Sequence, residues 1–161
     1  MSRIRHSLSL FAAALAIGAT LPAPAARADY VQPHITHAPF GTVKLVVPIT
    51  SSDPAVWGFK LHNLQNSEAG ITQWKGRLDA RVVLYGPGVK LLEQPMDDSL
   101  KAEVDALRGK GVRFDICNNT LKAMKLDWHT LYGAKETDIV PSGFLEVAWL
   151  ADHGWAVDAM N

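Results

Sequence analysis

The residue with the most specific chemistry in this 161-residue chain is its one cysteine, Cys117. The surrounding pattern predicts that Cys117 ends a strand and directly precedes a helix whose N-cap is Asn118 or Asn119. Unpaired N–H groups in the loop formed by Asn118, Asn119 and Thr120 would face the sulfur and favour a thiolate over a thiol. A thiolate can attack a sulfur atom or accept one. A lone cysteine is also often a small buried core residue, so both interpretations stay open.

Two short segments are expected at the edge of a pocket beside this cysteine. Gly86, Pro87 and Gly88 form a turn, but they lack the spacing of a phosphate-binding glycine loop. Ser142 and Gly143 begin a later helix. The residues around Ser142 do not match the G-x-S-x-G pattern of a hydrolase nucleophile, so the sequence favours an N-cap role for this serine.

The histidines give a weaker signal. His34 and His37 have a His-x-x-His spacing that could contribute to a metal site. Two solvated histidines in an N-terminal arm are the favoured interpretation, and we predict no metal and no cofactor. A single cysteine also excludes an intrachain disulfide framework, a multi-cysteine zinc site and an iron–sulfur cluster.

Alternating strand and helix patterns indicate the elements that would position these residues. The nearly continuous apolar run over residues 42–49 is typical of a strand buried on both faces. Trp57, Leu61 and Leu64 recur at i, i+4 and i+7, which indicates a helix. This helix is expected to begin after an Asp53 N-cap and to reach about Asn66. The expected strands cover residues 42–49, 80–85, 112–116, 137–140 and 155–157, with helices in the four intervals.

Strands and helices that alternate at this spacing pair in parallel through right-handed crossovers. The chain is therefore predicted to be an α/β protein, a three-layer α/β/α sandwich with a parallel five-stranded sheet. Ligands of such sheets bind beyond the carboxyl ends of the strands. Five segments are expected to gather at that edge: residues 50–53, 86–88, 117–120, 141–143 and the tail after Val157.

The N-terminus has the pattern of a signal peptide. Arg3 and Arg5 precede an apolar run, and Ala26-Arg27-Ala28 supplies a small-x-small cleavage pattern. An uncleaved membrane anchor is the disfavoured alternative, because two prolines interrupt the run. We therefore divide the chain into a signal peptide (1–28), an N-terminal arm (29–41) and an α/β domain (42–161), and expect a periplasmic protein with no stable membrane anchor after cleavage.

Charge gives no indication of an anionic partner. The whole chain carries 16 basic and 16 acidic residues, and cleavage after Ala28 would leave 13 and 16, a net charge of −3. A duplex nucleic-acid binder that acts through bulk charge is therefore excluded.

Several segments together resemble the DsrE/DsrF-like family. They are the run from Gly111 to Leu121, the Tyr85-Gly86-Pro87-Gly88 turn, and Val140 to Glu146 followed by Gly154-Trp155-Ala156. The similarity covers roughly residues 43–157. It implies a three-layer fold with a parallel five-stranded sheet, and assembly into trimers or hexamers. It also implies a sulfur relay through a persulfide on the cysteine at the position of Cys117, here in a secreted branch of the family.

Two functional hypotheses follow. The first is a sulfur carrier or sulfurtransferase-like relay protein that uses Cys117 near water at the strand end and exchanges sulfur with a donor or acceptor protein. The second is a non-catalytic, oligomeric periplasmic binding or assembly module in which Cys117 is buried. The five tryptophans, a residue type enriched at interfaces, support a homo-oligomer in either case.

Overall fold

The computed structural model describes Val31 and residues 38–159. The fold belongs to the unit formed by residues 35–161. The predicted signal peptide, the His34–His37 pair and most of the predicted arm lie outside the described residues.

A five-stranded parallel sheet forms the centre of the fold, with strand order β4-β3-β2-β1-β5. The strands are β1 (Gly41–Ile49), β2 (Gly76–Leu84), β3 (Arg113–Cys117), β4 (Ile139–Val140) and β5 (Ala156–Val157). The longest pairing joins β1 to β2 along their whole lengths, from Gly41 opposite Gly76 to Ile49 opposite Leu84. The predicted fold class is confirmed.

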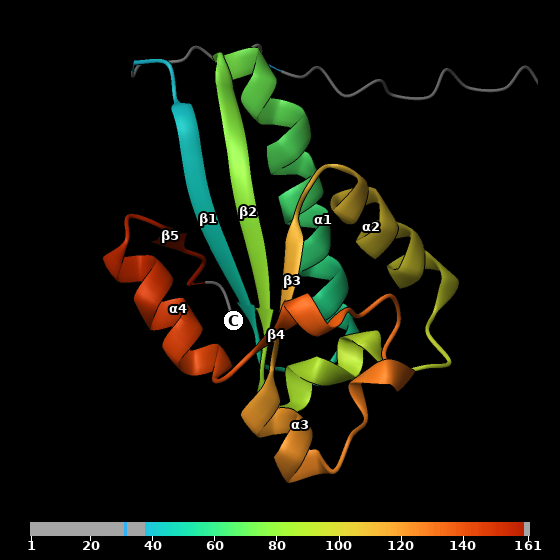
Figure 1. Ribbon diagram of the computed structural model, residues 1–161. Helices are drawn as coiled ribbons and strands as arrows, with labels where there is room; N and C mark the ends of the chain where they lie inside the picture. The colour runs from blue at the N-terminus through green and yellow to red at the C-terminus, as the bar shows by residue number, and fades with distance from the viewer. Residues whose placement is uncertain (1–30, 32–37, 160–161) are drawn as a thin grey trace, which may run out of the picture. The chain divides into compact units, whose positions relative to one another are not determined.

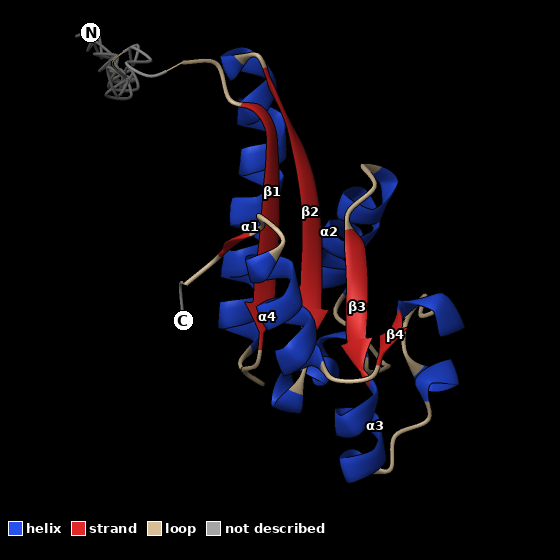
Figure 2. Ribbon diagram, turned by 60° about the vertical axis from the view of Figure 1, so that its left-hand side comes forward, coloured by secondary structure: helices blue, strands red, loops and turns tan. Residues whose placement is uncertain are grey.

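Helices cover both faces of this sheet, as Figures 1 and 2 show. Helices α1 (Pro54–Ile71) and α2 (Asp98–Gly109) lie on one face, and α4 (Gly143–Asp152) lies on the other. Helix α3 (Asn118–Met124) extends beyond the carboxyl ends of the strands. Four short 3-10 helices complete the elements: η1 (Thr72–Trp74), η2 (Gly86–Leu92), η3 (Trp128–Thr130) and η4 (Glu136–Asp138).

Side-chain caps explain where the long helices begin. The Asp53 carboxylate accepts a hydrogen bond from the Ala55 N–H at 2.9 Å, and Pro54 occupies the first turn. The Asp97 carboxylate accepts from the N–H groups of Ser99 and Leu100 and so begins α2. The Asp53 cap agrees with the sequence-based expectation.

Several element ends differ from the prediction, and three of the differences have a clear physical reason. Helix α1 continues past Asn66 to Ile71, which is buried against the core. Strand β2 begins at Gly76 instead of Ala80, because Leu78 and Ala80 alternate with outward-facing polar residues and both reach the core. Helix α3 ends at Met124, since Lys125 adopts a left-handed conformation with φ of 54°.

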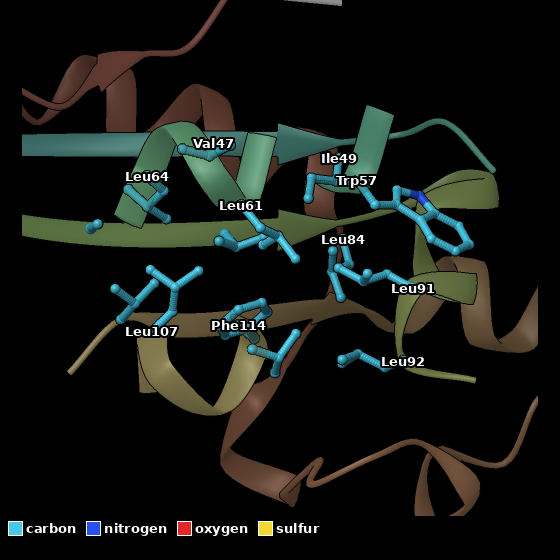
Figure 3. Close-up of a cluster of buried hydrophobic side chains, with 14 of the residues drawn as sticks. Val47, Ile49, Trp57, Leu61, Leu64, Leu84, Leu91, Leu92, Leu107 and Phe114 are labelled. Atoms are coloured by element: carbon cyan, nitrogen blue, oxygen red, sulfur yellow. The ribbon is translucent and has the colours of Figure 1, made fainter. Parts of the chain in front are cut away.

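The two faces of the sheet carry very different cores. The face under α1 and α2 holds a large apolar cluster that includes Ile49, Leu61, Leu107 and Phe114 (Figure 3). The face under α4 holds a small cluster whose buried members are Val46, Val83 and Leu150. None of the helices in the described part of the chain is long and apolar enough to cross a bilayer.

Candidate functional site

Cys117 lies where β3 passes into α3, at the carboxyl edge of the sheet. It is itself the N-cap of α3, so the expected cap at Asn118 or Asn119 is wrong by one or two residues. The short β3 ends with extended backbone at Cys117, and Asn118 is already helical. The residue is 4% exposed, so the expectation that this strand end lies near water is also wrong.

Several hydrogen-bond donors converge on the Cys117 sulfur. The sulfur accepts no hydrogen bond with full N-cap geometry, but the N–H groups of Asn119, Thr120 and Gly143 and the Thr120 hydroxyl lie close enough to stabilise its charged form. Burial raises the pKa of the Cys117 thiol, and hydrogen bonding from these donors lowers it by more, so the net pKa falls below the ordinary value. The surroundings of this buried sulfur therefore favour a thiolate.

Gly143 can donate to the sulfur because it has no side chain. A Cβ atom at this position would lie 2.8 Å from the Cβ of Tyr85 and 3.1 Å from the Cβ of Cys117, closer than side chains pack. The preceding Ser142 is the N-cap of α4, and its hydroxyl accepts from the Leu145 N–H at 3.4 Å. The first turn of α4 is thus placed directly over Cys117.

The turn after β2 is joined to the same site through Thr120. The Gly86 N–H donates to Thr120 Oγ1 at 2.8 Å, which leaves the hydroxyl proton of Thr120 free to point at the sulfur. Gly86 has a φ of +53°, a conformation that favours glycine. Gly88 packs directly on the carbonyl of Ile49, where a Cβ atom would overlap the backbone.

An open cavity of about 520 Å³ lies beside this arrangement. It is lined by residues of three of the expected edge loops and of α3: Ser52, Gly86, Pro87, Lys90, Asn119, Thr120, Ala123 and Met124. Lys90 places one cationic side chain there. The cavity could hold a small molecule next to the loop that contacts the sulfur, although Cys117 itself does not line it.

A charged network that the sequence analysis missed lies on the same face of β3 as Cys117. Asp115, two residues before Cys117 and fully buried, pairs with Arg113 at 3.1 Å and with Arg81 at 3.4 Å. Arg81 also pairs with Glu146 of α4 at 2.9 Å. Burial raises the pKa of Asp115 above its ordinary value, and the two arginines oppose that rise. The sequence does contain one signal for this network, because Asp115 is an acidic residue in an otherwise apolar strand, two positions before the cysteine.

A family model described as "DsrE/DsrF-like family" matches residues 51–157. The chain belongs to the DsrE/DsrF-like family. A solved structure from Methanobacterium thermoautotrophicum, the protein of unknown function MTH1491, is similar to it at 28% identity and a TM-score of 0.61. The match covers 73% of this chain and 97% of that chain. No curated protein matches the sequence.

In this DsrE/DsrF-like domain, four of the five segments expected at the carboxyl edge contribute to the site or its cavity. The described part of the tail after Val157, Asp158 and Ala159, does not, because β5 pairs with β1 at Leu45 and Val46. Asp158 instead pairs with the buried Lys60 at 3.0 Å, beside the middle of β1. Among the residues that the structure describes, no three histidine, cysteine, aspartate or glutamate side chains lie together as metal ligands.

Proposed function

We propose that this DsrE/DsrF-like protein is a sulfur carrier, or sulfurtransferase-like relay protein, that holds sulfur as a persulfide on Cys117. The observation that carries the proposal is the convergence of Asn119, Thr120 and Gly143 donors on the sulfur. The reactive form is the thiolate, and these donors stabilise it. Family membership supports a role in sulfur relay.

The transfer step balances without a redox partner. The Cys117 thiolate attacks the outer sulfur of a donor persulfide, R–S–SH, and an S–S bond forms to Cys117. The donor's own S–S bond breaks, and RS⁻ leaves with the electron pair. Delivery to an acceptor thiolate repeats the exchange in the opposite sense. The same backbone donors that stabilise the thiolate would stabilise the anionic persulfide.

Intact mass measured after incubation with a low-molecular-weight persulfide tests this function. The native protein should gain the mass of one sulfur atom, a reductant should remove it, and Cys117→Ser should gain nothing. Serine is nearly isosteric and can accept the same hydrogen bonds, so the thermal midpoint of Cys117→Ser should stay close to that of the wild type. A wild-type protein that loads sulfur after denaturation but never in its native state would contradict the carrier function.

The burial of Cys117 supports a second candidate, a non-catalytic oligomeric binding or assembly module. Cys117 is 4% exposed, as expected of a cysteine kept for packing. In that case Cys117 serves packing alone, and neither the native wild type nor Cys117→Ser should gain the mass of a sulfur atom from a persulfide donor. No loading of the native wild type, together with assembly into an oligomer, would favour the module.

We also propose that the protein acts in the periplasm. The support is the basic start, the apolar run and the Ala26-Arg27-Ala28 pattern of the sequence. Protein recovered from a periplasmic fraction should begin at Asp29. Recovery of the whole chain, including residues 1–28, from the cytoplasmic fraction would contradict this location.

A further inference from the structure

A charged network ties the first turn of α4 to the sheet. Arg81, on the central strand β2, pairs with Glu146 of this turn at 2.9 Å and with Asp115 of β3 at 3.4 Å. Its guanidinium carbon also lies 5.3 Å from the centre of the Trp155 ring, in the segment that follows α4. One side chain therefore holds both ends of the α4 region against two strands.

The apolar anchoring of α4 is small by comparison. The fully buried members of its cluster are Val46, Val83 and Leu150, and Leu150 belongs to the last part of the helix. At the start of the helix, Phe144 and Leu145 are mostly exposed. The Phe144 ring lies 6.4 Å from the Tyr85 ring between centroids, and Val147 packs partly against the cluster. The Arg81–Glu146 pair, which is only partly exposed and so weakly screened, adds a directed contact that fixes the first turn.

That first turn also carries one of the donors to the sulfur. Glu146 lies three residues after Gly143, so the two residues are on adjacent positions of one helical face. The N–H of Gly143 faces the Cys117 sulfur, and the residue lies so close that a Cβ atom there would be 3.1 Å from the Cβ of Cys117. A shift of the first turn after its release from Arg81 would therefore disturb this close approach.

We propose that Arg81 and Glu146 are positioning residues for the Cys117 sulfur, because their ion pair keeps the Gly143 N–H directed at it. The Asp115 carboxylate supports the pair by accepting from the same nitrogen of Arg81, Nη1, at 3.4 Å. The role of the Arg81–Glu146 pair in sulfur transfer rests on the proposed function. Its effect on the ionisation of the Cys117 thiol does not.

The sign of the electrostatic effect makes Glu146→Ala a sharp test. Loss of a negative charge near Cys117, by itself, would favour the thiolate and increase its fraction. Loss of positioning would instead move the Gly143 N–H away from the sulfur and decrease the thiolate fraction. The thiolate fraction is measured from ultraviolet absorbance as a function of pH, with Cys117→Ser as the background. We expect a fraction at neutral pH that is lower than in the wild type by about threefold to tenfold.

Three further variants separate positioning from charge and from general damage. Glu146→Asp keeps the charge but withdraws the carboxylate from Arg81, and should behave like Glu146→Ala even if the alanine variant folds poorly. Glu146→Gln keeps the length and one hydrogen bond to Arg81, and should show a smaller change. Glu136→Ala removes an exposed glutamate from η4 and should leave the fraction unchanged.

The outcomes separate this inference from the proposed function. A thiolate fraction in Glu146→Ala and Glu146→Asp that equals or exceeds the wild-type value overturns the positioning role, whatever the sulfur loading. If these variants lower the fraction while the wild-type protein never loads sulfur, the positioning role stands and the carrier function fails.

Discussion

Cys117 combines two properties that usually oppose each other, since the residue is buried and its surroundings favour ionisation. Burial in an apolar site would hold the sulfur as a neutral thiol. Here the compensation comes from backbone N–H groups and one hydroxyl. Donors of this kind are fixed by the fold and need no neighbouring cation. The chemistry of the residue is therefore determined by the loops around it.

Gly143→Ala should separate the sulfur from one of these donors. The new Cβ atom would meet Tyr85 and Cys117 within about 3 Å, so the start of α4 must shift away. We expect the pKa of the Cys117 thiol to rise toward its ordinary value, seen as a higher midpoint in the pH dependence of thiolate absorbance. Gly109→Ala is the matched control, since a Cβ atom there meets nothing. An unchanged midpoint in Gly143→Ala would contradict the role given to this glycine.

Sequence patterns located Cys117 at a strand-to-helix junction but not its environment. The strand-to-helix junction at Cys117 and the N-cap at Ser142 follow from local rules, and both are present. The Gly143–Cys117 approach brings together residues 26 positions apart, which no local pattern contains. The pairing of Arg81 with Glu146 spans 65 positions and depends on the packing of α4. Such contacts become visible only when the crossovers are placed in space.

At the scale of elements, periodicity predicted the order of strands and helices but not all of their ends. Strand β2 gains four residues at its start because β1 offers a pairing partner along its full length. Helix α3 stops at Met124, where Lys125 takes a left-handed backbone conformation. Pairing partners and the backbone conformation of single residues decide where helices and strands end. The spacing of apolar residues in the sequence does not reveal either of them.

The buried carboxyl group in β3 gives a pH dependence of known sign. Burial raises the pKa of Asp115, so the native state binds this proton more tightly than the unfolded state. The resulting stabilisation is present below the ordinary pKa of an aspartate, about 3.9. It is lost as the pH rises through the higher pKa that Asp115 has in the folded protein. The free energy of unfolding of the wild type relative to Asp115→Asn should therefore fall as the pH rises above about 4.

Urea unfolding at several pH values measures this difference. Asp152→Asn is the control, because Asp152 is exposed near the end of α4 and its replacement should give no such trend. A difference between wild type and Asp115→Asn that rises with pH would show that the arginines outweigh burial at Asp115.

At the scale of the whole molecule, the outer surface of α4 indicates self-association. Phe144, Leu145 and Trp149 are 67%, 65% and 55% exposed, an apolar surface of a kind that partners usually cover. We expect a homo-oligomer, a trimer or a hexamer, in light scattering at micromolar concentration. Trp149→Ser should lower the measured mass, whereas Trp74→Ser, on η1, should not. A wild-type mass equal to that of one chain would contradict the assembly.

The unequal cores on the two faces of the sheet have a consequence for the motions of the protein. The α1 and α2 side is held by a large cluster, whereas α4 is held by three fully buried side chains and a charged network. Regions with little buried apolar area open at a lower free energy than the global core. We therefore expect amide hydrogen exchange in α4 to be faster than in α1. Such partial openings would expose the Cys117 sulfur to another molecule while the rest of the sheet stays folded.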